Sequence, residues 1–132
     1  MRFMMIVKGN SDYEAGVPPS PELMAAVGKH TEEGIKSGVV LANGGLLPSS
    51  MGARIRAGGG KLTVTDGPFP ETKELIGGFA IIQAKSKQEA IELGSQFMQI
   101  HVDVLGPSYN GELEVRQMFE GGDCGSGNSG ME

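Results

Sequence analysis

Residues 66–74, Asp66-Gly67-Pro68-Phe69-Pro70-Glu71-Thr72-Lys73-Glu74, run directly into Leu75-Ile76-Gly77-Gly78-Phe79 and decide the fold. This stretch places a turn, four charged residues, two prolines and a glycine pair between two apolar runs. Connecting loops carry function more often than the elements they join, so this loop is the first place to look for a site. Its turn residues also have a structural purpose, because an Asp side chain can bond its own downstream amides and Pro fixes φ.

The runs on either side of this loop predict strands. Leu75 to Ala84 and Phe3 to Val7 are apolar at nearly every position, which predicts central strands buried on both faces. Residues 53–57 and 61–65 alternate, with Gly58-Gly59-Gly60 between them, and predict a hairpin. We expect its Ile55, Leu62 and Val64 to point inward and its Arg54 and Arg56 to point outward.

Two segments predict helices. Ser20-Pro21-Glu22 is a helix start, followed by apolar residues at helical spacing up to Ile35 and by a stop at Lys36 and Gly38. Gly28 and Gly34 each cost this helix about 1 kcal/mol against Ala, so we expect close packing against a sheet there. Ser86 and Glu89 form a capping box before a second apolar stripe.

The remaining segments are a loop over residues 9–19, a strand over 39–47, a connection over 100–111 and a last strand over 112–119. We expect a bulge or a close backbone approach at Asn43-Gly44-Gly45. Residues 1–119 therefore form one domain, and residues 120–132 are rich in Gly and Ser and predict a flexible tail.

The order strand, helix, strand, hairpin, strand, helix, strand predicts an α+β fold. It is a ferredoxin-like antiparallel sheet with two helices on one face and an inserted β-hairpin. The central strands are apolar on both faces, so the face without helices must be covered. We expect a homodimer in which two protomers pack sheet to sheet.

Charge and cysteine content exclude several classes of function. The net charge of −5 and the absence of a basic stripe argue against direct nucleic-acid binding. No run approaches the ~20 apolar residues of a membrane helix, and the lone Cys124 suits a reducing compartment. We expect a cytoplasmic protein with no membrane partner and no cofactor, because no phosphate loop, dinucleotide fingerprint or paired-Cys metal site occurs.

The loop sequence DGPFPETKELIGGF resembles the signature of the YCII-related proteins, in their DGPF branch. The resemblance covers roughly residues 1–119. It includes Pro18–Ala26, Pro48–Arg54 and Ser86–Glu92. It implies a dimeric α+β-barrel fold, in agreement with the architecture derived above.

The resemblance implies two kinds of function. Some YCII relatives resemble small enzymes with a His-Asp pair, including one that acts on a chlorinated hydroxyquinol. Many DGPF relatives accompany extracytoplasmic-function sigma factors. The histidine of the enzyme-like branch lies on the first helix, where this chain has Val27, and His30 lies one turn further on. The resemblance therefore transfers no general base to this chain.

The candidate catalytic residues are His30, Asp66 and Lys73. His30 lies at the edge of the helix's apolar stripe and can face a cleft between helix and sheet, although a packed edge histidine explains it too. Asp66 serves equally as a turn residue. A Lys73 between Glu71 and Glu74 stays protonated, which favours binding an anionic group over proton abstraction.

The candidate binding residues are Asn43, Arg54, Glu71 and Glu74. Arg54 can clamp a carboxylate or phosphate bidentately, and a solvated or dimer-facing strand explains it equally well. The charged loop residues can also be a solvated surface. His101 and Asp103 supply two metal ligands without a third, so we expect no metal site.

Two functions stay open. The first is a small-molecule binder or an acid/base enzyme (isomerase, lyase or dehydrohalogenase-like) with a pocket between sheet and helices. The second is a non-catalytic dimeric module in stress or sigma-factor-dependent transcription control, which acts through a protein partner. A concave pocket with convergent titratable groups favours the first, and an exposed apolar patch favours the second.

Overall fold

The sheet is antiparallel and has four strands in the order β2-β5-β1-β6. The computed structural model describes residues 1–71 and 74–120. Its helices are α1 (Ser11–Glu14), α2 (Pro21–Lys36) and α3 (Lys87–Leu105), with a 3-10 turn at Ser49–Met51. Its strands are β1 (Arg2–Lys8), β2 (Val40–Gly45), β3 (Ala53–Gly58), β4 (Lys61–Asp66), β5 (Ile76–Gln83) and β6 (Leu113–Gln117).

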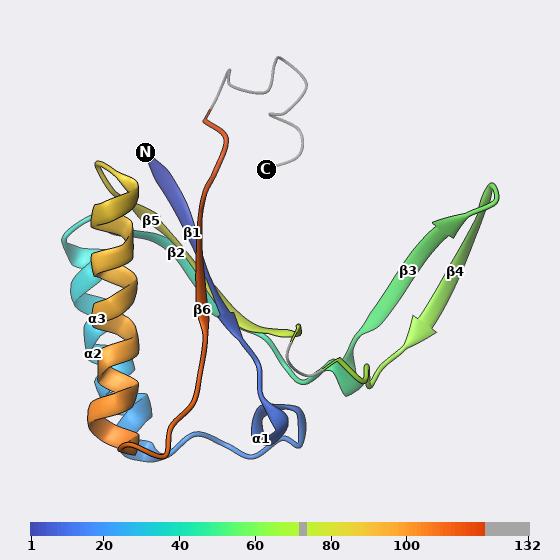
Figure 1. Cartoon of the computed structure of the whole chain (residues 1–132), viewed down its shortest axis with the longest axis horizontal. Coiled ribbons are helices and arrows are strands. Elements are labelled where there is room, and N and C mark those ends of the chain that lie inside the picture. Colours follow the sequence, from blue (N-terminus) through green and yellow to red (C-terminus); the bar gives the residue numbers. More distant parts are fainter. Residues whose placement is uncertain (72–73, 121–132) are drawn as a thin grey trace.

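This order confirms the ferredoxin-like α+β fold. The strands predicted to be central, β1 and β5, pair with each other from Arg2 opposite Gln83 to Lys8 opposite Ile76. Helices α2 and α3 lie side by side on one face of the sheet (Figure 1). No helix in the described part of the chain is long and apolar enough to cross a membrane.

The hydrophobic core lies between this face and α3. Phe3 and Ile82 are each 1% exposed, and Ala90 of α3 is fully buried against them. Burial of a large aliphatic or aromatic side chain stabilises the fold by roughly 1.5–3 kcal/mol. Alternate residues of β1 supply the core, because successive strand side chains point to opposite faces.

Both long helices begin as expected. The Ser20 hydroxyl accepts a hydrogen bond from the Leu23 amide (3.1 Å), and Pro21 is the first residue of α2. The Ser86 hydroxyl accepts from the Glu89 amide (3.1 Å). The Glu89 carboxylate accepts a hydrogen bond from the amide of Lys85 (2.8 Å). In the usual capping box the donor is the amide of the N-cap residue itself, which here is Ser86.

The two helix glycines have different surroundings. A Cβ on Gly34 would lie 2.6 Å from Val40 Cγ2, so the expected close packing against the sheet is confirmed at this position. A Cβ on Gly28 would meet nothing within 4 Å, so the same expectation is wrong there. Contacts within the described chain give no reason for Gly28.

Three local expectations are corrected. The segment taken as a loop contains α1, which Asn10 caps by accepting from the Tyr13 amide (2.8 Å). The connection expected from residue 100 is helical up to Leu105, because the apolar stripe of α3 continues through it. A bulge was one of two alternatives for Asn43-Gly44-Gly45, and the register shift lies instead between Val40 and Ala42. The other alternative, a close backbone approach, is confirmed, because a Cβ on Gly78 would lie 3.0 Å from the Gly44 carbonyl oxygen.

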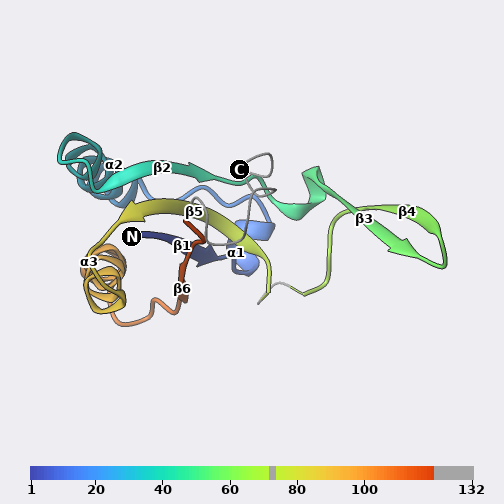
Figure 2. The same cartoon turned by 90° about the horizontal axis from the view of Figure 1, so that it is seen from above.

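The hairpin of β3 and β4 forms as expected, but it extends away from the sheet and the helices (Figures 1 and 2). Gly59 and Gly60 make the turn with φ of 58° and 77°. The inward direction expected for Ile55, Leu62 and Val64 is wrong: these side chains are 70%, 74% and 64% exposed. No layer formed by residues 1–71 or 74–120 lies beneath them.

Replacing Gly34 by Ala tests the close approach of α2 to β2. Ala is the better helix former, yet we expect Gly34→Ala to lower the free energy of unfolding by about 1–3 kcal/mol, because the Val40 side chain must move. Adding Val40→Ala removes the clashing methyl, so the double variant should lose less than the sum of the single ones. Urea unfolding measures all three, and additive losses would contradict the packing.

Candidate functional site

The loop of residues 66–71 crosses the 3-10 turn at very close range. The Gly67 amide donates to the Gly52 carbonyl (2.9 Å). A Cβ on Gly67 would lie 1.7 Å from the Ser49 carbonyl oxygen, so only glycine allows this crossing. The crossing holds the base of the hairpin against the turn that precedes it.

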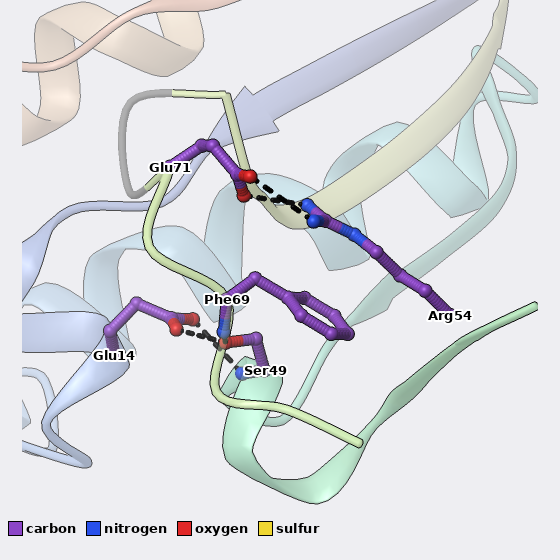
Figure 3. Close-up of polar contacts among 5 residues, drawn as sticks. All are labelled: Glu14, Ser49, Arg54, Phe69 and Glu71. Carbon is purple, nitrogen blue, oxygen red and sulfur yellow. Dashed lines mark hydrogen bonds and ion pairs between the residues drawn. The ribbon is translucent and has the colours of Figure 1, made fainter. Parts of the chain in front are cut away.

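A short polar chain links this loop to α1 (Figure 3). The Phe69 amide donates to the Ser49 hydroxyl (3.0 Å), and that hydroxyl donates to the Glu14 carboxylate. The Ser49 amide donates to the second oxygen of the same carboxylate (3.0 Å). Three segments that are far apart in the sequence are thus held together by one serine.

Arg54 of β3 forms a second contact with the loop. Its guanidinium donates two hydrogen bonds to the Glu71 carboxylate, at 3.2 and 2.8 Å, and lies 3.9 Å above the Phe69 ring (Figure 3). The hydrogen bond from Arg54 lowers the pKa of Glu71, and the same bond raises the pKa of Arg54. The carboxylate that Arg54 grips bidentately belongs to its own chain. We name Glu14, Ser49, Arg54, Phe69 and Glu71 the hairpin clamp.

The other loop candidates that the structure describes, Asp66 and Glu74, are not brought together with His30. Asp66 is exposed at the end of β4, and its carboxylate accepts no hydrogen bond from any residue in the described ranges. Glu74 is exposed, with its amide donating to the Glu71 carbonyl (3.0 Å). Lys73 lies outside the described residues. The expected meeting of Asp66 with His30 is not seen, because Asp66 does not line the groove that His30 lines.

That groove lies between the sheet and the helices and has a volume of about 1160 Å³. This volume is slightly above the roughly 300–1,000 Å³ of typical ligand pockets. Apolar side chains of α2, α3 and β6 line it, among them Val27, Leu93 and Leu113. The polar groups around it include His30, Asn43, Gln96, His101 and Tyr109.

His101 is the best-oriented titratable group of the groove. Its Nδ1 lies 3.0 Å from the Phe97 carbonyl oxygen. A carbonyl only accepts, so Nδ1 carries the hydrogen and a neutral ring keeps its lone pair on Nε2. The ring is stacked on Tyr109 (centroids 5.4 Å apart, 29° between planes) and tilted against Phe97 (4.8 Å, 55°). Two aromatic neighbours and one hydrogen bond thus fix its orientation.

Two tyrosines beside the groove are protonated hydrogen-bond donors. Burial raises the pKa of Tyr109, whose hydroxyl makes no hydrogen bond to any residue of the described chain. A Cβ on Gly111 would lie 2.0 Å from that hydroxyl, so glycine makes room for it. Burial also raises the pKa of Tyr13, but the Tyr13 hydroxyl donates to the Gly77 carbonyl (2.9 Å) and is already used.

His30 and Asn43 are the sequence candidates that line the groove. His30 is half-buried on α2, and Asn43 is exposed on β2, an edge strand. The glycine pairs near Asn43 are explained by packing: a Cβ on Gly78 would lie 3.0 Å from the Gly44 carbonyl oxygen. The catalytic role of His30 and the binding role of Asn43 stay predictions.

The metal fragment considered at His101 and Asp103 does not assemble. The Asp103 carboxylate accepts from the Gln99 amide (2.9 Å), while His101 bonds Phe97. Within residues 1–71 and 74–120, no three His, Cys, Asp or Glu side chains are placed to hold a metal ion.

Sequence reasoning missed the pair of His101 and Tyr109. Its signal was present: Leu93, Phe97, His101 and Leu105 continue the stripe of α3 at four-residue spacing. The link between Glu14 and Ser49 had no sequence signal, because a contact across 35 residues leaves no local pattern.

Two comparisons with known proteins each found a match. A family model described as the YCII-related domain matches residues 1–98. The uncharacterized protein R00369 of Rhizobium meliloti (strain 1021) is 35% identical to this chain over 97 residues. The match covers 74% of this chain and 70% of the relative.

Acid should open the hairpin clamp before it unfolds the domain. The pKa of Glu71 is lowered in the fold, so its contribution is complete above the ordinary carboxyl pKa and is lost as the pH falls through the lower folded value. We expect the backbone amide NMR signals of Arg54 and Phe69 to shift below about pH 4, while core signals stay unchanged.

The variant Glu71→Gln is the control for this titration. It keeps a hydrogen-bond acceptor but has no titrating carboxyl, so its hairpin signals should lack the acid step. An identical acid step in Glu71→Gln would assign the transition to another group.

Proposed function

The chain belongs to the YCII-related family, and we propose that it binds a small organic molecule in the groove between sheet and helices and acts on it by acid/base chemistry. One observation carries the proposal: His101 has its Nδ1 fixed by the Phe97 carbonyl and its ring lines an apolar groove. A ring held in this way leaves its second nitrogen for a ligand.

Each polar group has a role in this proposal. His101 takes or gives a proton at Nε2, and the Tyr109 hydroxyl beside it donates a hydrogen bond to a ligand oxygen. His30 lies across the groove on α2 as a second acid/base group. Asp66 lies away from the groove and has no role in this proposal, and Lys73 stays a candidate from the sequence alone. The reaction class is that of an isomerase, a lyase or a dehydrohalogenase-like enzyme, without a nucleotide cofactor.

The groove lining sets the kind of ligand. Apolar side chains dominate the walls, and the Lys8 ammonium among the lining residues is ion-paired with Glu114 (3.5 Å). A molecule with an apolar, planar body and a few hydroxyl or carbonyl oxygens fits such a lining better than a multiply charged one.

We also propose that two copies pack sheet to sheet. The face of the sheet without helices carries Met4, Ile6, Phe79 and Ile81, which alternate with the core residues of β1 and β5. Apolar side chains on both faces are typical of a sheet that is covered on both sides. A second copy offers the same apolar surface in return.

A specific observation favours the second candidate function, a dimeric module linked to stress or sigma-factor-dependent transcription control. The apolar face of the hairpin is exposed, as a surface for a protein partner must be. The groove with its oriented histidine favours the enzyme, because a partner module has no need of it.

A thermal-shift screen tests the groove. Small hydroxylated aromatics, organic acids and lactones should include compounds that raise the melting temperature by several degrees, as binding to the folded state does. His101→Gln and Tyr109→Phe should reduce that shift, while Lys87→Gln on the exposed side of α3 should leave it unchanged. A flat screen, or shifts equal in all variants, would contradict the proposal.

Sedimentation at micromolar concentration tests the sheet-to-sheet dimer. We expect Ile81→Glu to yield monomers, because it places a charge in the middle of an apolar interface. Ile91→Glu makes the same chemical change on exposed α3 and should leave the dimer intact. A wild-type monomer, or a dimeric Ile81→Glu, would exclude this interface.

A further inference from the structure

The β3–β4 hairpin has one apolar and one polar face. Ile55 is opposite Val64 and Ala57 is opposite Leu62, so these four side chains share a face. Arg54 is opposite Thr65 and Arg56 is opposite Thr63 on the other face. Arg54 at the base contacts Glu71 and Phe69, but beyond this contact the hairpin extends away from the rest of the described chain (Figures 1 and 2).

Such a hairpin needs cover from outside its own chain. An isolated two-stranded hairpin is only marginally stable in water, and it is stabilised when another element packs on its apolar face. Yet the hairpin clamp fixes the base of this hairpin with a bidentate ion pair and the Ser49 hydrogen bonds. The clamp thus holds the apolar face of the hairpin away from its own chain, where a partner molecule can contact it.

A receiving surface exists at the opposite end of the same chain. A shallow hollow between α2 and the edge strand β2 is lined by Met24, Val27, Gly28 and Ile35. Met24 and Ile35 are 59% and 54% exposed, and Leu41 on β2 is 50% exposed. We name these five residues the α2 strip. Gly28, which has no packing reason within the described chain, lies among them and lets another backbone come close.

Charge also favours this pairing. Residues 53–66 carry three cations and one carboxylate and so have a charge of +2. Because the whole chain has a net charge of −5, the remaining residues carry −7. Glu32 and Lys36 line the hollow as an exposed ion pair (3.3 Å), so the negative charge lies in the body as a whole and not in the hollow itself. An approaching hairpin brings Arg56 and Lys61 toward a body of opposite sign.

We propose that the hairpin is an arm that lays Ile55, Leu62 and Val64 on the α2 strip of a second copy of this chain. The hairpin cannot reach its own strip, because the two lie at opposite ends of the molecule in both views (Figures 1 and 2). It projects on the side of the sheet away from the helices, so in a pair packed sheet to sheet it extends over the partner (Figure 1). Each copy supplies one arm and one strip. This contact goes beyond the proposed dimer and is separate from the groove.

Disulfide trapping between two kinds of copy tests the contact. All variants carry Cys124→Ser, one copy also carries Ile55→Cys, and the other carries Gly28→Cys and a tag of different mass. Mild oxidation of the mixture should give a cross-linked species with one copy of each. If the new side chain at Gly28 blocks the approach of the hairpin, Met24→Cys provides a second position for the same test. Ile91→Cys on α3 is the control for random collision.

Three outcomes would overturn the proposal. The first is that neither strip variant forms a mixed cross-link, and the second is that the yield only equals that of the Ile91→Cys control. The third is efficient cross-linking of Ile55→Cys with itself, which would mean that hairpins pair with each other. A dimer by sedimentation without the mixed cross-link would leave the sheet-to-sheet interface and exclude the arm. None of these results bears on ligand binding in the groove.

An affinity measurement gives an independent result. Ile55→Asp should weaken self-association at least about tenfold, because it removes a buried aliphatic side chain and buries a charge. Thr63→Asp adds the same charge on the opposite face and should change the dissociation constant less than about threefold. Equal effects of the two would show that the apolar face is not the docking face.

Discussion

The structure depends on the packing of β1 and β5 against α3 at one end of the sheet. Phe3, Ile82 and Ala90 exclude water there almost completely. Toward the other end, Gly78 of β5 lies on the same face as Ile82 and is paired with Gly45 of β2, so neither supplies a side chain to fill the space beneath the helices. The same two layers thus give a dense core where residues are large and a groove where they are absent. The groove is a consequence of this uneven filling.

The loop of residues 66–74 has its main effect on the hairpin. Gly67 permits the crossing over Ser49, Phe69 is held by the Ser49 hydroxyl, and Glu71 neutralises Arg54. Two residues that suggested ligand binding are therefore bound to each other. A carboxylate held by two charge-assisted hydrogen bonds is a poor receptor for a further cation, and it neutralises the Arg54 charge that would attract a second anion.

The sequence predicted the fold well because the decisive patterns are local. Apolar runs marked β1 and β5, Ser20 and Ser86 marked the helix starts, and three glycines marked the hairpin turn. It did not predict which candidate residues come together, because such contacts link distant parts of the chain. Helical spacing placed His30 on the groove, but nothing local showed that Asp66 lies away from it or that Tyr109 stacks on His101. Alternation in β3 indicated an apolar face, and only the tertiary structure shows that this face has no layer beneath it.

The case for a covered hairpin depends on contiguity. Single exposed aliphatic residues are normal on protein surfaces, and Val102 of α3 is one of them. Ile55, Leu62 and Val64 differ because strand register puts them on one face of a two-stranded ribbon, where no neighbouring element can shield them. The clamp at the base adds a second reason, since it prevents the ribbon from folding back onto the body. A ribbon that keeps its apolar face exposed in this way gains stability when another surface covers that face.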